Sequence, residues 1–151
     1  MAEYTYANLQ VVQPGSNVIF QSSIPCNKGY VIHRNNSGIL TLRGISSGCN
    51  RFARYQVTFN GNIAVPDGST VGPIALALAI GGEAVPTSRA IVTPAATEEY
   101  FNVTCTAIID VPVGCCYNIA IENVSPSVDS SATTTVPVNV ADANLVFSRI
   151  A

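Results

Sequence analysis

Residues 54–65 alternate between hydrophobic and polar positions. The hydrophobic row, which Gly61 interrupts, consists of Tyr55, Val57, Phe59, Ile63 and Val65. The polar row consists of Arg54, Gln56, Thr58, Asn60 and Asn62. Because successive side chains of a β-strand point to opposite faces, this pattern predicts a long strand with one face in the core and the other in water.

The same alternation predicts strands at 103–110 and 117–122. Shorter runs at 5–12, 18–21, 30–34, 39–43, 74–80, 87–93 and 139–150 bring the total to about ten strands, with no helix. In residues 74–80, isoleucine and leucine alternate with alanine between a Gly-Pro and a Gly-Gly pair. This run predicts a strand that is buried on one face and closely packed on its alanine face.

Proline and glycine punctuate the chain between these runs. Val65–Gly68 and Val111–Gly114 each place proline at the second and glycine at the fourth position, which is typical of a tight turn. Both are expected to join neighbouring strands, and Pro14-Gly15 closes the N-terminal strand. Short strands with regular turns predict an all-β sandwich or barrel, formed as a single domain over residues 1–151.

Five segments together resemble the jelly roll shared by tumour necrosis factor and the globular head of the complement first component. They are SGILTLRG (37–44), RYQVTFNGNIAVP (54–66), GPIALALAIGGE (72–83), EYFNVTCTAIIDVPVGCCYNIAIEN (99–123) and ANLVFSRIA (143–151). In bacteria and phages, similar domains cap collagen-like or fibrous proteins. The resemblance implies an antiparallel jelly-roll sandwich that forms a compact homotrimer, with one sheet facing a threefold axis and the termini close together. The chain departs from that context because it has no Gly-X-Y stalk.

Aromatic and aliphatic residues of long strands line the axis of such trimers. The resemblance therefore makes Tyr100, Phe101 and Phe147 candidates for the trimer interface. The alternative for each is a place in the core of the subunit.

Composition narrows the function further. The net charge is −2 and only 11% of residues are charged, against about 25% in typical soluble domains. Basic residues are few and scattered, which argues against binding of nucleic acid or of an anionic membrane surface. Hydrophobic residues make up 48% of the chain, a surplus that favours subunit contacts over a merely neutral, hydroxyl-rich exterior. The first residues do not form a secretory signal, and no run is long enough to span a bilayer.

Nothing in the sequence predicts an enzyme, a cofactor or a metal site. His33 is the only histidine, it lies near no nucleophile motif, and an exposed position on a strand is expected for it. The acidic residues form no short ligand cluster, which leaves a calcium site assembled across loops or at the trimer axis as an alternative.

The five cysteines show no zinc-site spacing. Cys26 and Cys49 flank the expected hairpin of strands 30–34 and 39–43, so a disulfide between them is predicted. Cys105 belongs to a hydrophobic row and is expected in the core. Cys115 and Cys116 follow a turn, where one side chain should point inward and one outward. The outer thiol could be free or link subunits, while the favoured alternative is that both cysteines pack.

These observations predict a trimeric jelly-roll surface protein with a structural or binding role. It would decorate a virion or form a fibre head, or belong to a bacterial extracellular or spore-surface assembly. Its partners would be copies of itself and capsid or cell-surface proteins. One alternative is a carbohydrate-binding module whose partners are glycans, and a second is a capsid subunit that builds a shell by itself.

Overall fold

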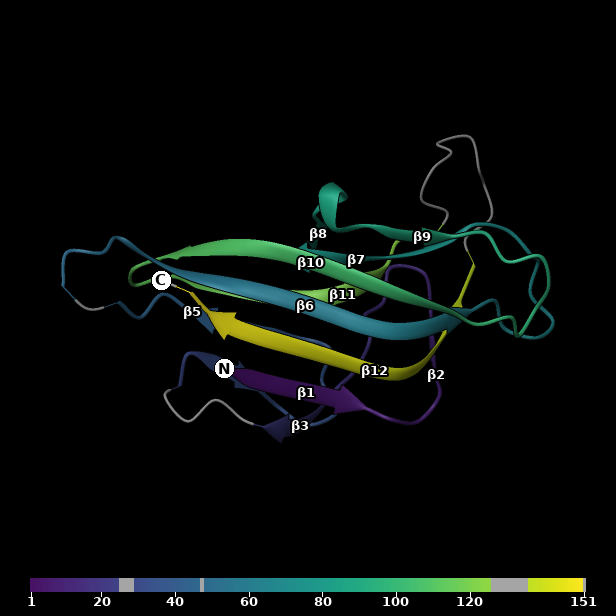
Figure 1. Cartoon of the computed structure of the whole chain (residues 1–151), viewed down its shortest axis with the longest axis horizontal. Helices are drawn as coiled ribbons and strands as arrows, with labels where there is room; N and C mark the ends of the chain where they lie inside the picture. Colours follow the sequence, from purple (N-terminus) through teal and green to yellow (C-terminus); the bar gives the residue numbers. More distant parts are fainter. Residues whose placement is uncertain (25–28, 47, 126–135, 151) are drawn as a thin grey trace.

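The computed structural model describes residues 1–24, 29–46, 48–125 and 136–150, and these form a sandwich of two antiparallel sheets (Figure 1). The first sheet has the order β10-β6-β12-β1-β3, with β2 paired to β12. Its strands are β1 (Ala2–Tyr6), β2 (Gln10–Val12), β3 (Gln21–Ile24), β6 (Phe52–Ala64), β10 (Phe101–Pro112) and β12 (Val138–Arg149). The second sheet has the order β4-β5-β11-β7-β8, with β9 paired to β7. Its strands are β4 (Val31–His33), β5 (Leu40–Arg43), β7 (Ile74–Ile80), β8 (Glu83–Ala84), β9 (Ala90–Val92) and β11 (Cys116–Asn123).

The alternation predicted for the long strand β6 is confirmed. Its hydrophobic row is buried between the two sheets, and its polar row lies on the outward face of the first sheet. Gly61 continues the inward row. The position requires glycine because a Cβ atom there would lie 2.9 Å from Cζ of Phe59. The Phe59 ring thus fills the space that a larger residue at position 61 would need, and it packs edge-on against Phe20 with ring centroids 6.2 Å apart.

The strand β7 is buried on both faces, as its sequence predicts. Residues from Ile74 to Ala79 are at most 1% exposed. Ile74, Leu76 and Leu78 belong to the core between the sheets, while the intervening alanines are buried on the opposite face. Small side chains therefore satisfy the close packing on that face.

The expected N-terminal strand at 5–12 is instead two strands, β1 and β2. Both pair with β12, but β1 reaches Ala143 and β2 begins opposite Val140. Between these points β12 has an irregular register, and Asp142 adopts a φ of +53°. This bulge breaks the ladder that a continuous N-terminal strand would have followed.

The predicted strand at 87–93 is also shorter than expected. A 3-10 turn, η1 (Pro86–Ser88), precedes β9 and places the Ser88 hydroxyl against the edge of β7. This hydroxyl accepts a hydrogen bond from the Leu78 N–H at 2.9 Å and donates one to the Val85 carbonyl at 2.7 Å. The Ser88 side chain therefore satisfies a backbone group of β7 that a longer strand would have paired. In the described part of the chain, no helix is long and apolar enough to cross a membrane.

The turn at 111–114 forms, but it starts at Pro112, where the carbonyl accepts a hydrogen bond from the Cys115 N–H at 3.0 Å. Gly114 occupies the third position with a φ of +83°, which glycine adopts at little cost. The expectation that it joins neighbouring strands is wrong, because β10 lies in the first sheet and β11 in the second. The turn after β6 likewise leads from the first sheet to the second, so the chain winds around the sandwich.

Both chain ends lie at the same end of the sandwich (Figure 1). The register explains this position, because Ala2 at the start of β1 is opposite Phe147 near the end of β12. The turn between β10 and β11 lies at this end too, since Pro112 is opposite Phe52 at the start of β6. We call it the terminal end of the molecule.

Asn123 ties the β11 end to two other segments. Its side-chain amide is 1% exposed and donates to the carbonyls of Val12 and Val136 at 2.9 and 3.0 Å. Its side-chain oxygen accepts from the Ser125 N–H at 2.9 Å. Three buried backbone groups thus depend on one side chain.

We predict that Asn123→Ala lowers the free energy of unfolding by about 1–3 kcal/mol, because it leaves buried polar groups without partners. Asn118→Ala on the same strand is the matched control, since Asn118 is exposed and its oxygen accepts from the Thr41 hydroxyl at 3.0 Å. Urea denaturation of both variants measures the difference. Equal stabilities would contradict the assigned role.

Candidate subunit interface

The outward face of the first sheet carries side chains that are paired across β6 and β10. The pairs in direct register are Asn62 with Asn102, Asn60 with Thr104, Thr58 with Thr106, Gln56 with Ile108, Arg54 with Asp110 and Phe52 with Pro112. We call this set the paired face. It runs along two of the longest strands, β6 and β10, which lie side by side in Figure 1.

Most polar members of the paired face are hydrogen-bonded to the residue opposite. The Asn102 amide donates to the Asn62 oxygen at 3.1 Å, and the Thr104 hydroxyl donates to the Asn60 oxygen at 3.4 Å. The hydroxyls of Thr58 and Thr106 lie 3.3 Å apart, and Thr106 also donates to the Val57 carbonyl at 3.1 Å. These groups therefore have partners without water.

An ion pair lies near the terminal end of the paired face. The Arg54 guanidinium donates two hydrogen bonds to the Asp110 carboxylate, at 2.7 and 2.9 Å. These bonds lower the pKa of Asp110 and raise that of Arg54. The guanidinium also lies over the Phe52 ring, 4.9 Å from its centroid. The pair cancels its own charge and is held in a fixed geometry.

Hydrophobic side chains are exposed around this ion pair. Ile108 is 64% exposed, more than any other large hydrophobic residue of a described strand. Ile150 is 48% exposed and lies beside Arg54, whose carbonyl accepts its N–H at 2.9 Å. With Phe52 at 38%, three apolar side chains thus surround a neutral ion pair.

Sequence reasoning missed Ile108, although the signal is present. Thr104, Thr106 and Asp110 form the polar row of β10, and Ile108 lies in that row between Thr106 and Asp110. An isoleucine in an outward row has no place in the core of its own subunit. Its side chain is therefore exposed on the outward face of the single subunit.

The structure does not bring the three interface candidates together. Phe147 is 1% exposed and packs edge-on against Tyr4, with ring centroids 6.0 Å apart, so it occupies the core position that the sequence left as the alternative. Tyr100 and Phe101 are 41% and 38% exposed. They lie at the start of β10, opposite the terminal end.

Glu98 fixes the surroundings of Tyr100. Its carboxylate accepts hydrogen bonds from the Asp67 N–H at 3.0 Å, the Asn139 amide at 3.1 Å and the Tyr100 hydroxyl at 3.3 Å. Desolvation and the Glu98 charge raise the pKa of Tyr100. Glu98 has a φ of +59°, an uncommon conformation for a residue with a side chain. Three hydrogen bonds therefore hold Glu98 in its strained backbone conformation. They join the β6–β7 and β9–β10 connections to β12.

His33 does not occupy the exposed position expected for it. Its ring is half-buried and packs edge-on against Tyr4, with centroids 4.8 Å apart. Its Nε2 atom lies 2.9 Å from the Ser37 carbonyl. The ring therefore packs against β1 of the first sheet and forms a hydrogen bond within the hairpin of β4 and β5.

Two of the cysteines differ from expectation. Cys105 is buried as predicted, but Cys115 and Cys116 are both exposed, so neither packs in the core. Cys49 is exposed in the connection from β5 to β6. Cys26 lies outside the described residues, and the Cys26–Cys49 disulfide stays a prediction. Among the described residues, no three histidine, cysteine or acidic side chains lie close enough to hold a metal ion.

Two solved structures superimpose on the whole chain. The globular domain of zebrafish complement 1qA protein does so with a TM-score of 0.60 and 12% identity over 98% of its own length. The Eiger TNF of S. frugiperda does so with a TM-score of 0.63 and 12% identity over 92% of its length.

The chain has the TNF-like jelly-roll fold. The all-β class and the jelly-roll resemblance predicted from the sequence are thus confirmed. No family model matches the sequence. No curated protein matches it either. At this level of identity, the TNF-like likeness establishes the architecture, and function has to be argued from the surfaces described above.

We predict that the fold loses stability as the pH rises from about 9 to about 11. Burial raises the pKa of the Cys105 thiol from 9.0 to about 11, so the unfolded chain releases this proton at a lower pH than the folded one. The loss should reach about 2–3 kcal/mol at the upper limit. Chemical denaturation across this range should show a steeper pH dependence for the natural sequence than for Cys105→Ala. Parallel curves would contradict this account.

Proposed function

We propose that this chain is a structural and binding module that forms a homotrimer through the paired face. The observation that carries the proposal is a long outward sheet face that is neutral in charge, internally hydrogen-bonded and fringed by exposed apolar side chains. The shared fold with TNF and the complement domain is consistent with this assembly.

Mutual pairing makes this face suitable for burial. A polar group that loses water without gaining a partner costs about 1–3 kcal/mol, but an amide or hydroxyl that is already bonded to its neighbour loses less on being covered. Ile108 and Phe52 then supply apolar area that gains from contact. Because the Arg54–Asp110 pair is neutral as a unit, copies can approach without net repulsion from it.

The biological setting of the proposal is a surface assembly and not catalysis. The single histidine is engaged by Tyr4 and Ser37, so it is not poised to act as a base. The module would serve a virion, as decoration or fibre head, or a bacterial extracellular or spore-surface layer. Its outer connections would then contact capsid or cell-surface proteins.

We predict that Ile108→Lys weakens the trimer at least about tenfold, because burial of an isoleucine contributes about 1.5–3 kcal/mol and a buried lysine adds a desolvation cost. Ile32→Lys is the matched control, since Ile32 is 51% exposed on β4 of the second sheet. Light scattering should give about three times 15.8 kDa for the natural sequence and the control, and a lower mass for Ile108→Lys on dilution.

Two results would refute the proposed trimer. One is a natural sequence that stays monomeric at micromolar concentration. The other is an Ile32→Lys variant that dissociates as readily as Ile108→Lys. Because both side chains are exposed in the subunit, circular dichroism should show an unchanged fold in each variant.

The second candidate function is carbohydrate binding, and a hollow at the hairpin of β4 and β5 favours it. This hollow of about 300 Å³ is lined by Ile32, His33, Arg34, Ser37, Ile39 and Thr41. It combines hydroxyl and guanidinium donors with two exposed isoleucines. Reproducible signals on a glycan array that disappear in Arg34→Ala would support it.

A further inference from the structure

Three of the four described cysteines are exposed, and the strand registers place all three at the terminal end of the sandwich. Cys115 and Cys116 follow the turn from β10 to β11, and Cys49 lies in the connection from β5 to β6. Backbone hydrogen bonds join these two connections, from the Val113 N–H to the Arg51 carbonyl at 3.0 Å and from the Gly114 N–H to the Gly44 carbonyl at 3.2 Å. The accessible thiols thus gather on one surface.

The turn that carries Cys115 and Cys116 is held in place by the backbone around it. The Cys115 N–H donates to the Pro112 carbonyl at 3.0 Å, and the Cys115 carbonyl accepts from the Gly44 N–H at 2.8 Å. Gly44 allows this contact, because a Cβ atom there would overlap the Pro112 carbonyl. The backbone that carries the two thiols is therefore held in place by hydrogen bonds.

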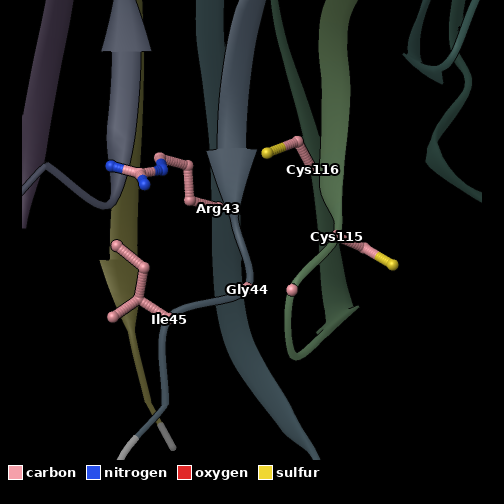
Figure 2. A pocket seen from close by; sticks show the side chains of 6 residues that line it. Arg43, Gly44, Ile45, Cys115 and Cys116 are labelled. Atoms are coloured by element: carbon pink, nitrogen blue, oxygen red, sulfur yellow. The ribbon is translucent and has the colours of Figure 1, made fainter.

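The two side chains point in opposite directions (Figure 2). Cys116 points toward β5, where Arg43 is its cross-strand neighbour, and Cys115 points away from that strand. Two thiols that diverge in this way cannot form a disulfide with each other unless the backbone moves. Cys105 is buried and therefore out of reach. When Cys49 is paired with Cys26, as the sequence predicts, a disulfide formed by Cys115 or Cys116 has its partner in another molecule.

We propose that the β10–β11 turn links copies of this chain covalently, with Cys115 and Cys116 each forming a disulfide with a cysteine of another copy. Two diverging thiols give each chain two links, which extends an array, whereas one thiol could only close a pair. Val113 at the tip of the turn is 49% exposed and would be covered when two turns meet. The proposal extends the assembly function proposed above, since the linked units would be trimers.

The oxidant is a low-molecular-weight disulfide. A thiolate of one copy attacks it, forms a mixed disulfide and releases one small thiol. A thiolate of the second copy then attacks the protein sulfur of that mixed disulfide and releases the second small thiol. Two protein thiols thereby lose two electrons and two protons, and the small disulfide gains them.

The test uses the full chain with Cys26→Ser and Cys49→Ser, so that Cys115 and Cys116 are the accessible thiols of the described surface. The native protein is treated with oxidised glutathione, blocked with an alkylating reagent and run on a denaturing gel without reductant. We expect a ladder at two, three and more times 15.8 kDa that dithiothreitol removes. Adding Cys115→Ser or Cys116→Ser should stop the ladder at the covalent dimer, and adding both should leave only monomer.

Three results would overturn the proposal. The first is a ladder that persists when Cys115 and Cys116 are both replaced. The second is a species larger than a dimer when one of them is replaced. The third is that the chain with Cys26→Ser and Cys49→Ser takes up glutathione but forms no covalent dimer. Light scattering before oxidation tests the proposed trimer independently of the disulfides. A non-covalent trimer without cross-links refutes only the disulfide proposal, whereas cross-linking of a monomeric protein refutes only the trimer.

Discussion

The inward rows of β6, β10 and β12 are the constraint on which the molecule depends. Val57, Phe59 and Leu145 are fully buried, and each must face the second sheet to fill the space between the two layers. A slip of one residue in any strand would turn its entire row outward, so the core selects a single register. That register also fixes every outward pair. The alignment of Asn62 with Asn102 and of Arg54 with Asp110 is thus a consequence of core packing.

The paired face suggests how a subunit contact can be specific without being mainly hydrophobic. As an exposed ion pair, Arg54 and Asp110 contribute little to the stability of the single subunit. Once covered, they must stay together, because separating a buried pair leaves an uncompensated charge. The hydrogen-bonded threonines and asparagines impose a similar condition on any surface that covers them. Ile108 would supply attraction, and the polar pairs would restrict the docking position.

The sequence predicted those parts of the fold that depend on local periodicity. The strand β6 follows from alternation alone, because the burial of its residues alternates with the sequence, and the alternation of large side chains with alanine predicted β7, which is buried on both faces. The sequence could not predict which sheet the strand after Pro112 joins. The same Pro-x-Gly turn occurs in a hairpin within one sheet and in a connection between two sheets. His33 was misplaced for a similar reason, because its inward direction depends on Tyr4, a residue far away in the chain that packs against it. Phe147 is buried and Ile108 is exposed, so the row in which a residue lies is a better guide to its exposure than its residue type.

The two proposed contacts differ in how they limit growth. Association around a threefold axis is closed, because the third copy occupies the last open face and the assembly stops. The divergent thiols of Cys115 and Cys116 lie at the terminal end, and each remains an open point of attachment after the sheet faces are covered. A closed contact defines a unit of fixed size, and an open contact joins such units without limit. A surface layer of the proposed kind would need both properties, and in this proposal they lie on separate parts of the sandwich.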